Sequence, residues 1–248
     1  MKFNINSWSG YAEEYNKNAS FSENMIHTGL GLPGIHPVRI LKNSRSVIDI
    51  GCGTGINTFL LSKHTDGRVT GIDPVMSQIQ QAKQMFNASH AEYICCSFQK
   101  LPECISGKYD LAAFFGSLDY VCLDEAFFKI LDLITHSGSR CFISKFHPFW
   151  TTLYGNDTDK ELDSSYFDNG RKDLVRFGNM EFIRYHYTLS EFILLFNAHH
   201  WVLSEFAEPE PVFEHSAFAY NGYDNDPILK QRLGKIPMTA LFEFRKEM

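Results

Sequence analysis

The segment at residues 47–55 limits the possible folds of this chain more than any other. An apolar run leads into three glycines at alternate positions, and an amphipathic helical pattern follows. Glycine lets a backbone turn sharply and approach a ligand closely, and the next helix presents unpaired N–H groups. A second strand-like run, residues 69–73, ends in an acid placed to accept hydrogen bonds from a ribose diol. The segment predicts a nucleoside-binding strand–helix–strand unit.

The spacing of the glycines narrows the class of nucleoside ligand. A dinucleotide site would read G-x-G-x-x-G, whereas this loop reads Asp49-x-Gly51-x-Gly53-x-Gly55. That pattern resembles motif I of the class I methyltransferases that use S-adenosylmethionine, and the resemblance extends over residues 45–150. A nicotinamide oxidoreductase is the other enzymatic hypothesis, and the glycine spacing counts against it.

The resemblance implies a role for several residues of this unit. The glycines would form a loop beneath the cofactor, Asp73 would hold both ribose hydroxyls, and Asp49 would order the loop. Cys52 lies within the loop as a small buried residue, and Pro74 stands at the expected start of the next helix. The residues of this unit expected at the cofactor are Asp49, Gly51, Cys52, Gly53, Gly55, Asp73 and Pro74.

Two later segments and one near the N-terminus should complete the cofactor site. After the third strand, Ser97 stands where the family often has an aspartate that accepts from the adenine amino group. Its hydroxyl, or the backbone around Phe98, would take that role. After the fourth strand, Gly116 and Ser117 would pass the methionine end, since glycine allows close backbone approach. Tyr15 resembles the tyrosines of N-terminal lids.

Strand-like and helical patterns alternate from residue 46 to residue 146, which indicates a doubly wound, mostly parallel sheet. We expect an α/β, Rossmann-like methyltransferase fold with seven strands, the last of them antiparallel. Residues 1–248 are read as one domain with four parts. These are an N-terminal helical lid (1–44), the cofactor-binding core (45–147), a substrate-covering insertion (148–187), and a C-terminal helix with the last two strands (188–248).

His147, just after the fifth strand, is the candidate general base. A hydroxyl or amide-like acceptor benefits from such a base, whereas a phenolate, thiolate or free amine does not need one. The alternative is a structural histidine that bonds the loop before Pro148. The aromatic-rich lid and insertion supply the candidate substrate-binding residues, which are Tyr11, Phe149, Trp150, Tyr185 and His186.

Bulk properties limit the partners. A net charge of −6 and a pI near 5.9 argue against nucleic acid, because phosphate neutralisation needs a basic stripe. No apolar run reaches transmembrane length and no signal core opens the sequence, so we expect a cytoplasmic protein without membrane contact, monomeric or homodimeric. The six cysteines lack zinc-type spacing, so we expect no metal and read them as free thiols.

The function expected from these features is methyl transfer from S-adenosylmethionine, with S-adenosylhomocysteine as product, to O or N of a small-molecule metabolite. The acidic pI, the aromatic surplus and the insertion favour a small acceptor. A methyltransferase acting on tRNA or protein would usually show a basic extension. A non-catalytic cofactor-binding subunit is the third hypothesis, which the intact loop and Asp73 disfavour.

Overall fold

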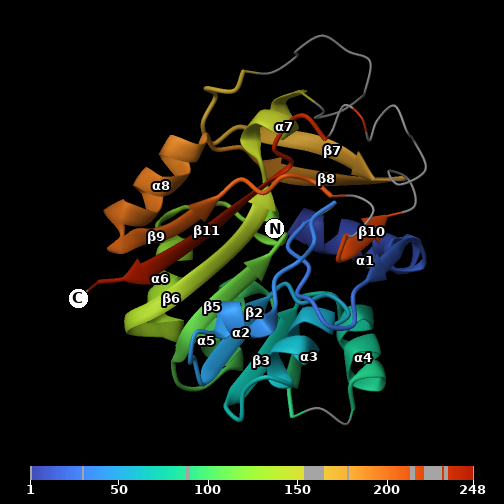
Figure 1. Cartoon of the computed structure of the whole chain (residues 1–248), viewed down its shortest axis with the longest axis vertical. Coiled ribbons are helices and arrows are strands. Elements are labelled where there is room, and N and C mark those ends of the chain that lie inside the picture. Colours follow the sequence, from blue (N-terminus) through green and yellow to red (C-terminus); the bar gives the residue numbers. More distant parts are fainter. Residues whose placement is uncertain are drawn as a thin grey trace.

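A computed structural model describes residues 2–29, 31–87, 90–153, 165–177, 179–212, 216–220, 231 and 234–247. Within these residues the central sheet has seven strands in the order β4-β3-β2-β5-β6-β11-β9 (Figure 1). In that order the strands are β4 (Glu92–Cys95), β3 (Arg68–Asp73), β2 (Ser46–Ile50), β5 (Tyr109–Phe115), β6 (Thr135–Phe146), β11 (Thr239–Lys246) and β9 (Trp201–Ala207).

The strand order places a ligand site at one end of the sheet. β2 pairs in parallel with both β3 and β5, and β11 pairs antiparallel with β6 and β9. The chain runs outward from β2 to β4 and then returns to the other side of β2 as β5. Ligands bind at such a switch point, outside the carboxyl ends of the strands. The predicted fold class, with its antiparallel last strand, is confirmed.

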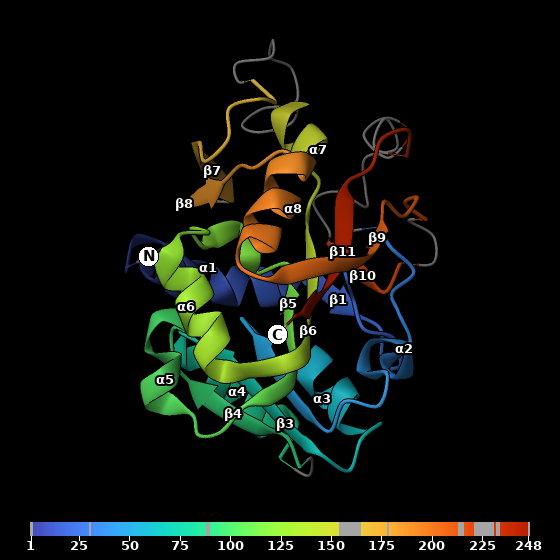
Figure 2. The same ribbon diagram turned by 90° about the vertical axis from the view of Figure 1, so that its left-hand side faces the viewer.

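Helices cover both faces of the sheet because the strand residues alternate between two hydrophobic cores (Figure 2). Val47 packs under α2 (Pro37–Leu41) and α3 (Ile56–Ser62). Ile48 packs on the opposite face. The helices of that face are α5 (Leu101–Cys104), α6 (Glu125–Ile134) and α8 (Leu189–Ala198), with the short 3-10 turns η1 (Phe98–Lys100) and η2 (Leu118–Tyr120) before α5 and α6.

Helix α4 (Met76–Met85) begins two residues later than the sequence suggested. Val75 is extended and is the last residue before the helix, and its N–H donates to Asp73 Oδ1 at 2.8 Å. That bond holds the chain in a turn after β3, so the helix starts at Met76 and not at Pro74. At the start of α8, the hydroxyl of Thr188 accepts from the N–H of Glu191 at 3.1 Å, and the N–H of Thr188 donates to Oδ1 of Asn169 at 2.8 Å.

The lid and the insertion form a layer beyond the carboxyl ends of the strands. The lid is α1 (Lys2–Asn18), followed by β1 (Ala19–Phe21), which pairs with β10 (Phe218–Tyr220). The insertion contains α7 (Pro148–Leu153) and a hairpin of β7 (Lys172–Phe177) and β8 (Met180–Tyr185). Figure 1 shows the hairpin and α1 next to each other above the sheet.

The cysteines depart from the prediction at one pair. Cys96 and Cys104 form a disulfide across eight residues, so the expectation that all six are free thiols is wrong there. The chain turns back through η1 and α5 and brings the two sulfurs together, which the spacing alone does not indicate. The remaining four cysteines are free. Across the described residues, no helix is long and apolar enough to cross a bilayer.

Candidate functional site

The glycine loop between β2 and α3 is shaped by two different constraints. Gly51 has φ 80°, and a Cβ there would lie 2.4 Å from Cβ of Ser117. Gly53 has φ 55° but faces open space, with no atom within 4 Å of a built Cβ. The N–H groups of Gly51 and Cys52 donate to the carbonyl of Ile72 at 2.8 and 2.9 Å. The loop is therefore fixed to β3 and presents a bare backbone surface at Gly53.

Gly55 and Cys52 have supporting roles in this loop. A Cβ at Gly55 would lie 2.5 Å from the ring of Tyr93 and 2.9 Å from Ala82. Gly55 thus permits close packing of the start of α3, and it does not line the cavity described below, contrary to the prediction. Cys52 does line it, but burial holds the pKa of its thiol well above the usual range.

Asp73 joins the loop to the end of β3. Its Oδ2 accepts from the N–H of Gly53 at 3.0 Å and its Oδ1 from Val75 at 2.8 Å. Burial raises the pKa of Asp73 to about 6, although both N–H bonds oppose that shift. A carboxylate has about four acceptor positions, so each oxygen keeps capacity for a hydroxyl donor. A ribose diol matches that capacity.

Asp49 is a buried acid with one unused oxygen. Its Oδ2 accepts from the hydroxyl of Thr58 at 2.6 Å, while its Oδ1 is buried and has no hydrogen-bond partner. Burial raises the pKa of Asp49 to about 7; the Thr58 bond opposes this and the nearby charge of Asp73 adds to it. An unpaired carboxylate oxygen in a cavity wall is suited to a cationic or hydrogen-bond-donating ligand.

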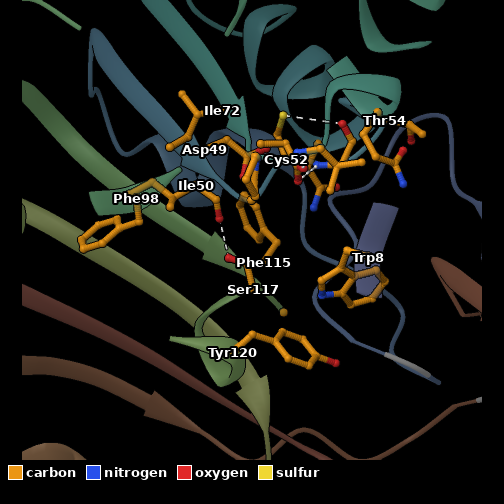
Figure 3. Close-up of a pocket in the computed structure, with 18 of the residues that line it drawn as sticks. Trp8, Asp49, Ile50, Cys52, Thr54, Ile72, Phe98, Phe115, Ser117 and Tyr120 are labelled. Atoms are coloured by element: carbon orange, nitrogen blue, oxygen red, sulfur yellow. Dashed lines mark hydrogen bonds between the residues drawn. The ribbon is translucent and has the colours of Figure 1, made fainter. Parts of the chain in front are cut away.

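These groups line a first cavity of about 200 Å³ at the carboxyl ends of β2, β3 and β5. Figure 3 shows Asp49 and Cys52 on one side of it, Phe98 on another, and the rings of Trp8 and Tyr120 toward the lid. Of the predicted cofactor residues, those that line the cavity are Tyr15, Asp49, Gly51, Cys52, Gly53, Asp73, Pro74, Phe98, Gly116 and Ser117.

Ser97 is the exception at the adenine end. Its neighbours Cys96 and Phe98 line the cavity, but Ser97 does not. The residue is extended, and successive side chains of an extended chain point to opposite sides. Its carbonyl accepts from the N–H of Lys100 at 2.9 Å and begins η1. The structure therefore gives no support to the predicted adenine contact of Ser97, whereas Phe98 lines the cavity.

A second cavity, of about 160 Å³, adjoins the first beneath the lid. Its wall is mainly aromatic and includes Tyr11, Phe146, Trp150 and Phe177. The residues that line both cavities are Trp8, Tyr15, His27, Phe115, Gly116 and Tyr120. The two cavities therefore adjoin at these residues, so a ligand in one would lie next to a ligand in the other.

Gly116 lines both cavities at this junction, and the next residue, Ser117, lines the first cavity only. Gly116 has φ 73°, its N–H donates to the carbonyl of Ser144 at 2.9 Å, and no atom lies within 4 Å of a built Cβ. A side chain there would enter the space between the cavities. The hydroxyl of Ser117 donates to the carbonyl of Ile50, which fixes the end of β5 to the end of β2 (Figure 3).

The lid covers the junction through an aromatic cluster and one amide. The ring of Trp8 stands perpendicular to those of Tyr15, at 5.8 Å, and Tyr120, at 5.4 Å. Asn4 exchanges two 2.7 Å hydrogen bonds with the backbone of Ile183 in β8 and donates to the carbonyl of Tyr120 at 3.3 Å. One side chain thus joins the lid, the hairpin and η2.

His147, the predicted base, lines neither cavity. Its Nδ1 accepts from the N–H of Phe149 at 3.1 Å, and its Nε2 lies 2.7 Å from Oε1 of Glu208. With Nδ1 accepting, the proton is on Nε2 and donates to Glu208. Burial lowers the pKa of His147, and Glu208 opposes that shift. His147 therefore has the geometry of a residue that caps the start of α7, which is the structural alternative to a catalytic base.

The other predicted substrate residues divide into two groups. Tyr11 and Trp150 line the second cavity, whereas Phe149, Tyr185 and His186 do not. His186 is buried within the insertion, with Nε2 2.8 Å from the carbonyl of Tyr166. Sequence reasoning also missed cavity residues, among them Trp8, Tyr120 and His27. Trp8 and His27 lie in the N-terminal segment, which reaches the site only after folding, and Tyr120 lies in η2 after β5; no local motif marks any of the three.

Comparisons with known proteins agree with this arrangement. Residues 47–138 match a family model described as a methyltransferase domain. A malonyl-[acyl-carrier protein] O-methyltransferase of Acetivibrio thermocellus is 31% identical over 163 residues, which are 65% of this chain and 52% of that protein. The chain therefore spans about half the length of this curated relative.

Solved structures share the fold at low sequence identity. A Listeria monocytogenes protein assigned to the S-adenosylmethionine-dependent methyltransferases has a TM-score of 0.65 at 19% identity, over 86% of this chain and 98% of that one. The 1,6-didemethyltoxoflavin-N1-methyltransferase of Burkholderia thailandensis, solved with its substrate and S-adenosylhomocysteine, has a TM-score of 0.54 at 15% identity, over 86% and 76%. Identities this low establish likeness of fold alone.

The sheet order, the glycine loop and the two buried acids define a nucleoside-binding α/β domain of the methyltransferase type. The match over residues 47–138 shows that this chain contains a methyltransferase domain, and its fold is that of solved S-adenosylmethionine-dependent methyltransferases.

Proposed function

We propose that this protein transfers a methyl group from S-adenosylmethionine to an O or N atom of a small molecule. The observation that carries the proposal is the pair of adjoining cavities, one lined by the glycine loop and two acids and the other by aromatic rings. Methyl transfer requires donor and acceptor to face each other in line, and holding them so is the main source of rate.

The first cavity fits S-adenosylmethionine in its chemistry. Asp73 has acceptor capacity for the ribose hydroxyls, and the unpaired Oδ1 of Asp49 suits a positively charged group. Gly53 offers a bare backbone surface, and Phe98 offers a ring beside the adenine position. When bound, S-adenosylmethionine supplies a methyl group made electrophilic by its sulfonium. The residues themselves bind, orient and neutralise charge.

The second cavity favours a small and largely apolar acceptor. Its volume is about 160 Å³ and its wall is mainly aromatic, as the walls of small-molecule sites commonly are. Its one described charged lining residue, Lys145, is already paired with Asp119 at 3.2 Å. The net charge of −6 also disfavours RNA. An acceptor on tRNA or protein, and a non-catalytic binding subunit, are the alternatives that the test below addresses.

The test is thermal unfolding with S-adenosylhomocysteine, S-adenosylmethionine and NAD, followed by an acceptor screen. A ligand that binds the folded state raises the unfolding temperature. We expect a rise with the two adenosyl compounds and none with NAD, and a smaller rise for Asp73→Ala but not for the exposed control Glu13→Gln. Release of S-adenosylhomocysteine with small phenols and amines supports the proposal. A response to NAD alone would refute it, and turnover only with tRNA or protein would favour the alternative.

A further inference from the structure

His27 occupies the wall that the two cavities share. It belongs to the six residues that line both, and among the described lining residues it is the only imidazole. Its ring lies beside that of Phe21, with centroids 4.8 Å apart. A histidine at this junction is within the space where a donor in the first cavity and an acceptor in the second would meet.

The backbone around His27 is held at three successive residues. Ile26 exchanges two 2.9 Å hydrogen bonds with Ile35. His27 donates from its N–H to Oδ1 of Asn57 at 3.1 Å and accepts from Nδ2 of the same side chain at 3.0 Å. The carbonyl of Thr28 accepts from the hydroxyl of Ser144. A segment outside regular structure is thus fixed to α3 and β6, which sets the position of the ring.

Asn57 also relates His27 to the cofactor loop. Asn57 lies in the first turn of α3, directly after the glycines, and is buried. The same helix start that ends the loop therefore positions the histidine. Bonds of this kind are characteristic of sites in which surrounding structure fixes a functional side chain. They fix the backbone from which the ring projects.

We propose that His27 is a catalytic residue that accepts the proton of a hydroxyl group on the acceptor. This inference rests on the proposed function and adds the class of acceptor, a hydroxyl compound such as a phenol. In the step, the acceptor oxygen forms a bond to the methyl carbon, and the sulfur–methyl bond breaks with its electron pair going to sulfur. The hydroxyl proton passes to a ring nitrogen of His27 and later to solvent.

The electrostatics of the junction suit this role. Burial lowers the pKa of His27 to about 4, which keeps the ring neutral near pH 7 and also makes it a weaker base than an exposed imidazole. The donor carries a positive charge before transfer, which disfavours an imidazolium beside it. Transfer removes that charge from sulfur as the imidazole gains one. The total charge of the site is therefore unchanged.

Other ionisable groups at the cavities do not compete for this role. The remaining titratable residues that line them are Tyr11, Tyr15, Asp49, Cys52, Asp73, Tyr120 and Lys145. Asp49 and Asp73 are buried at the loop, away from the second cavity, which neither of them lines. Lys145 is paired with Asp119. His27 is the neutral base that contacts both cavities.

The experiment compares wild type, His27→Gln and His136→Gln with a series of phenols of different acidity, following release of S-adenosylhomocysteine. His136 is a matched control because it is half-exposed and bonded to Asp110, at the opposite end of the sheet. At pH 7 we expect His27→Gln to lose about 100-fold or more in kcat, the usual contribution of a general base, with KM changed less than about threefold. The control should match wild type.

The pH profile distinguishes a base from a packing role. Without a base, turnover must depend on phenol that has ionised by itself, so kcat of His27→Gln should rise about tenfold per pH unit and the most acidic phenols should lose least. Wild-type kcat should be flat from pH 6 to 9. An equal loss at every pH and for every phenol, or a wild-type rate that climbs with pH in the same way, would overturn the inference.

A binding measurement separates failure of this inference from failure of the proposed function. Calorimetry with S-adenosylhomocysteine should give His27→Gln an affinity within about threefold of wild type. If that variant does not bind, His27→Asn and the wild-type pH profile take its place. Methylation of phenols with unchanged kcat in His27→Gln refutes the role of His27 alone. Methylation of amines but no phenol refutes the acceptor class, and no methylation at all counts against both proposals.

Discussion

Replacing Asp49 with asparagine should stabilise the protein while weakening its affinity for S-adenosylmethionine. Asp49 is buried in β2, with Oδ2 bonded to Thr58 at 2.6 Å and Oδ1 without a partner. Burial, the largest cause, raises its pKa from 3.8 to about 7. The folded protein therefore holds an ionised carboxylate at pH 8 in a place that disfavours it. The asparagine side chain would keep the shape and remove the charge.

The size of the effect follows from that pKa shift. A difference of about three units, at 1.36 kcal/mol per unit, gives a ceiling of about 4 kcal/mol at pH 8. The new amide N–H₂ in place of Oδ1 would be unpaired, which costs about 1–3 kcal/mol. We therefore expect a net gain of about 2 kcal/mol, or a rise in Tm of about 4–8 °C for a chain of this size.

The sign of the pH dependence identifies the cause. A carboxyl whose pKa is raised by folding contributes stability that is fully present below its unfolded pKa near 3.8 and is lost as pH rises through about 7. The advantage of Asp49→Asn over wild type should accordingly grow from about pH 4 to about pH 7 and then stay constant. Taking the difference between the two proteins cancels the titration of groups that do not interact with Asp49, whereas Asp73, whose charge contributes to the raised pKa of Asp49, is coupled to it.

The assay is urea unfolding of both proteins at several pH values, with calorimetry of the two adenosyl ligands. Affinity for S-adenosylmethionine should fall about tenfold more than that for S-adenosylhomocysteine, because only the former carries a sulfonium. Asp110→Asn is a control that should lower the stability of the protein instead of raising it. Burial acts to raise the pKa of Asp110, but hydrogen bonds from Arg45, His136 and Ser46 lower it overall. A variant at Asp49 that is less stable at pH 8, or a difference independent of pH, would refute the reasoning.

Three further substitutions test other parts of the site. Asp73→Ala should weaken S-adenosylmethionine binding more than tenfold by calorimetry, because it removes the acceptor held by Gly53; unchanged affinity would reject its ribose role. Asn4→Ala removes the two bonds to Ile183, so stability should fall by about 2 kcal/mol and acceptor KM should rise more than cofactor Kd. His147→Gln should lower Tm while leaving kcat within about threefold; a large loss of kcat with normal folding would restore it as the base.

Periodicity and glycine spacing were enough to predict the central sheet. β2 and β5 coincide with apolar runs that are followed by a glycine, as expected of parallel strands that are buried on both faces. The same reasoning placed Asp49 and Asp73 correctly, since each ends or lies within such a strand. These features are local, and a single sequence records them directly.

Side-chain direction after a strand was less predictable. Ser97 and His147 both follow strands at the correct edge of the sheet, but neither lines a cavity. Ser97 points away because its extended neighbours alternate, and His147 turns to cap α7 and bond Glu208. Which side a loop residue faces depends on the bonds of the next element. Residue type and position cannot determine that.

The acceptor side could not be predicted because its contacts join distant segments. Asn4 bonds Ile183, 179 residues away, and it also bonds the carbonyl of Tyr120. His27 reaches the junction through Asn57, 30 residues further along the chain. No pattern within either segment signals the other. A site formed by tertiary contacts of this kind leaves only general traces in the sequence, such as a surplus of aromatic residues.

The division of the site between two kinds of structure has a consequence for specificity. The cofactor cavity is formed at strand ends and a glycine loop, whose positions follow from the sheet. The acceptor cavity is closed by α1 and the β7–β8 hairpin, which Asn4 links to η2. Because Trp8 and Tyr120 belong to those linked segments and also line the first cavity, a change in the lid that alters the acceptor must also shift part of the cofactor wall. We therefore expect substitutions at Trp8 to change acceptor preference and S-adenosylhomocysteine affinity together. Trp150 lines the second cavity alone, so substitutions there should change acceptor preference and leave S-adenosylhomocysteine affinity unaltered.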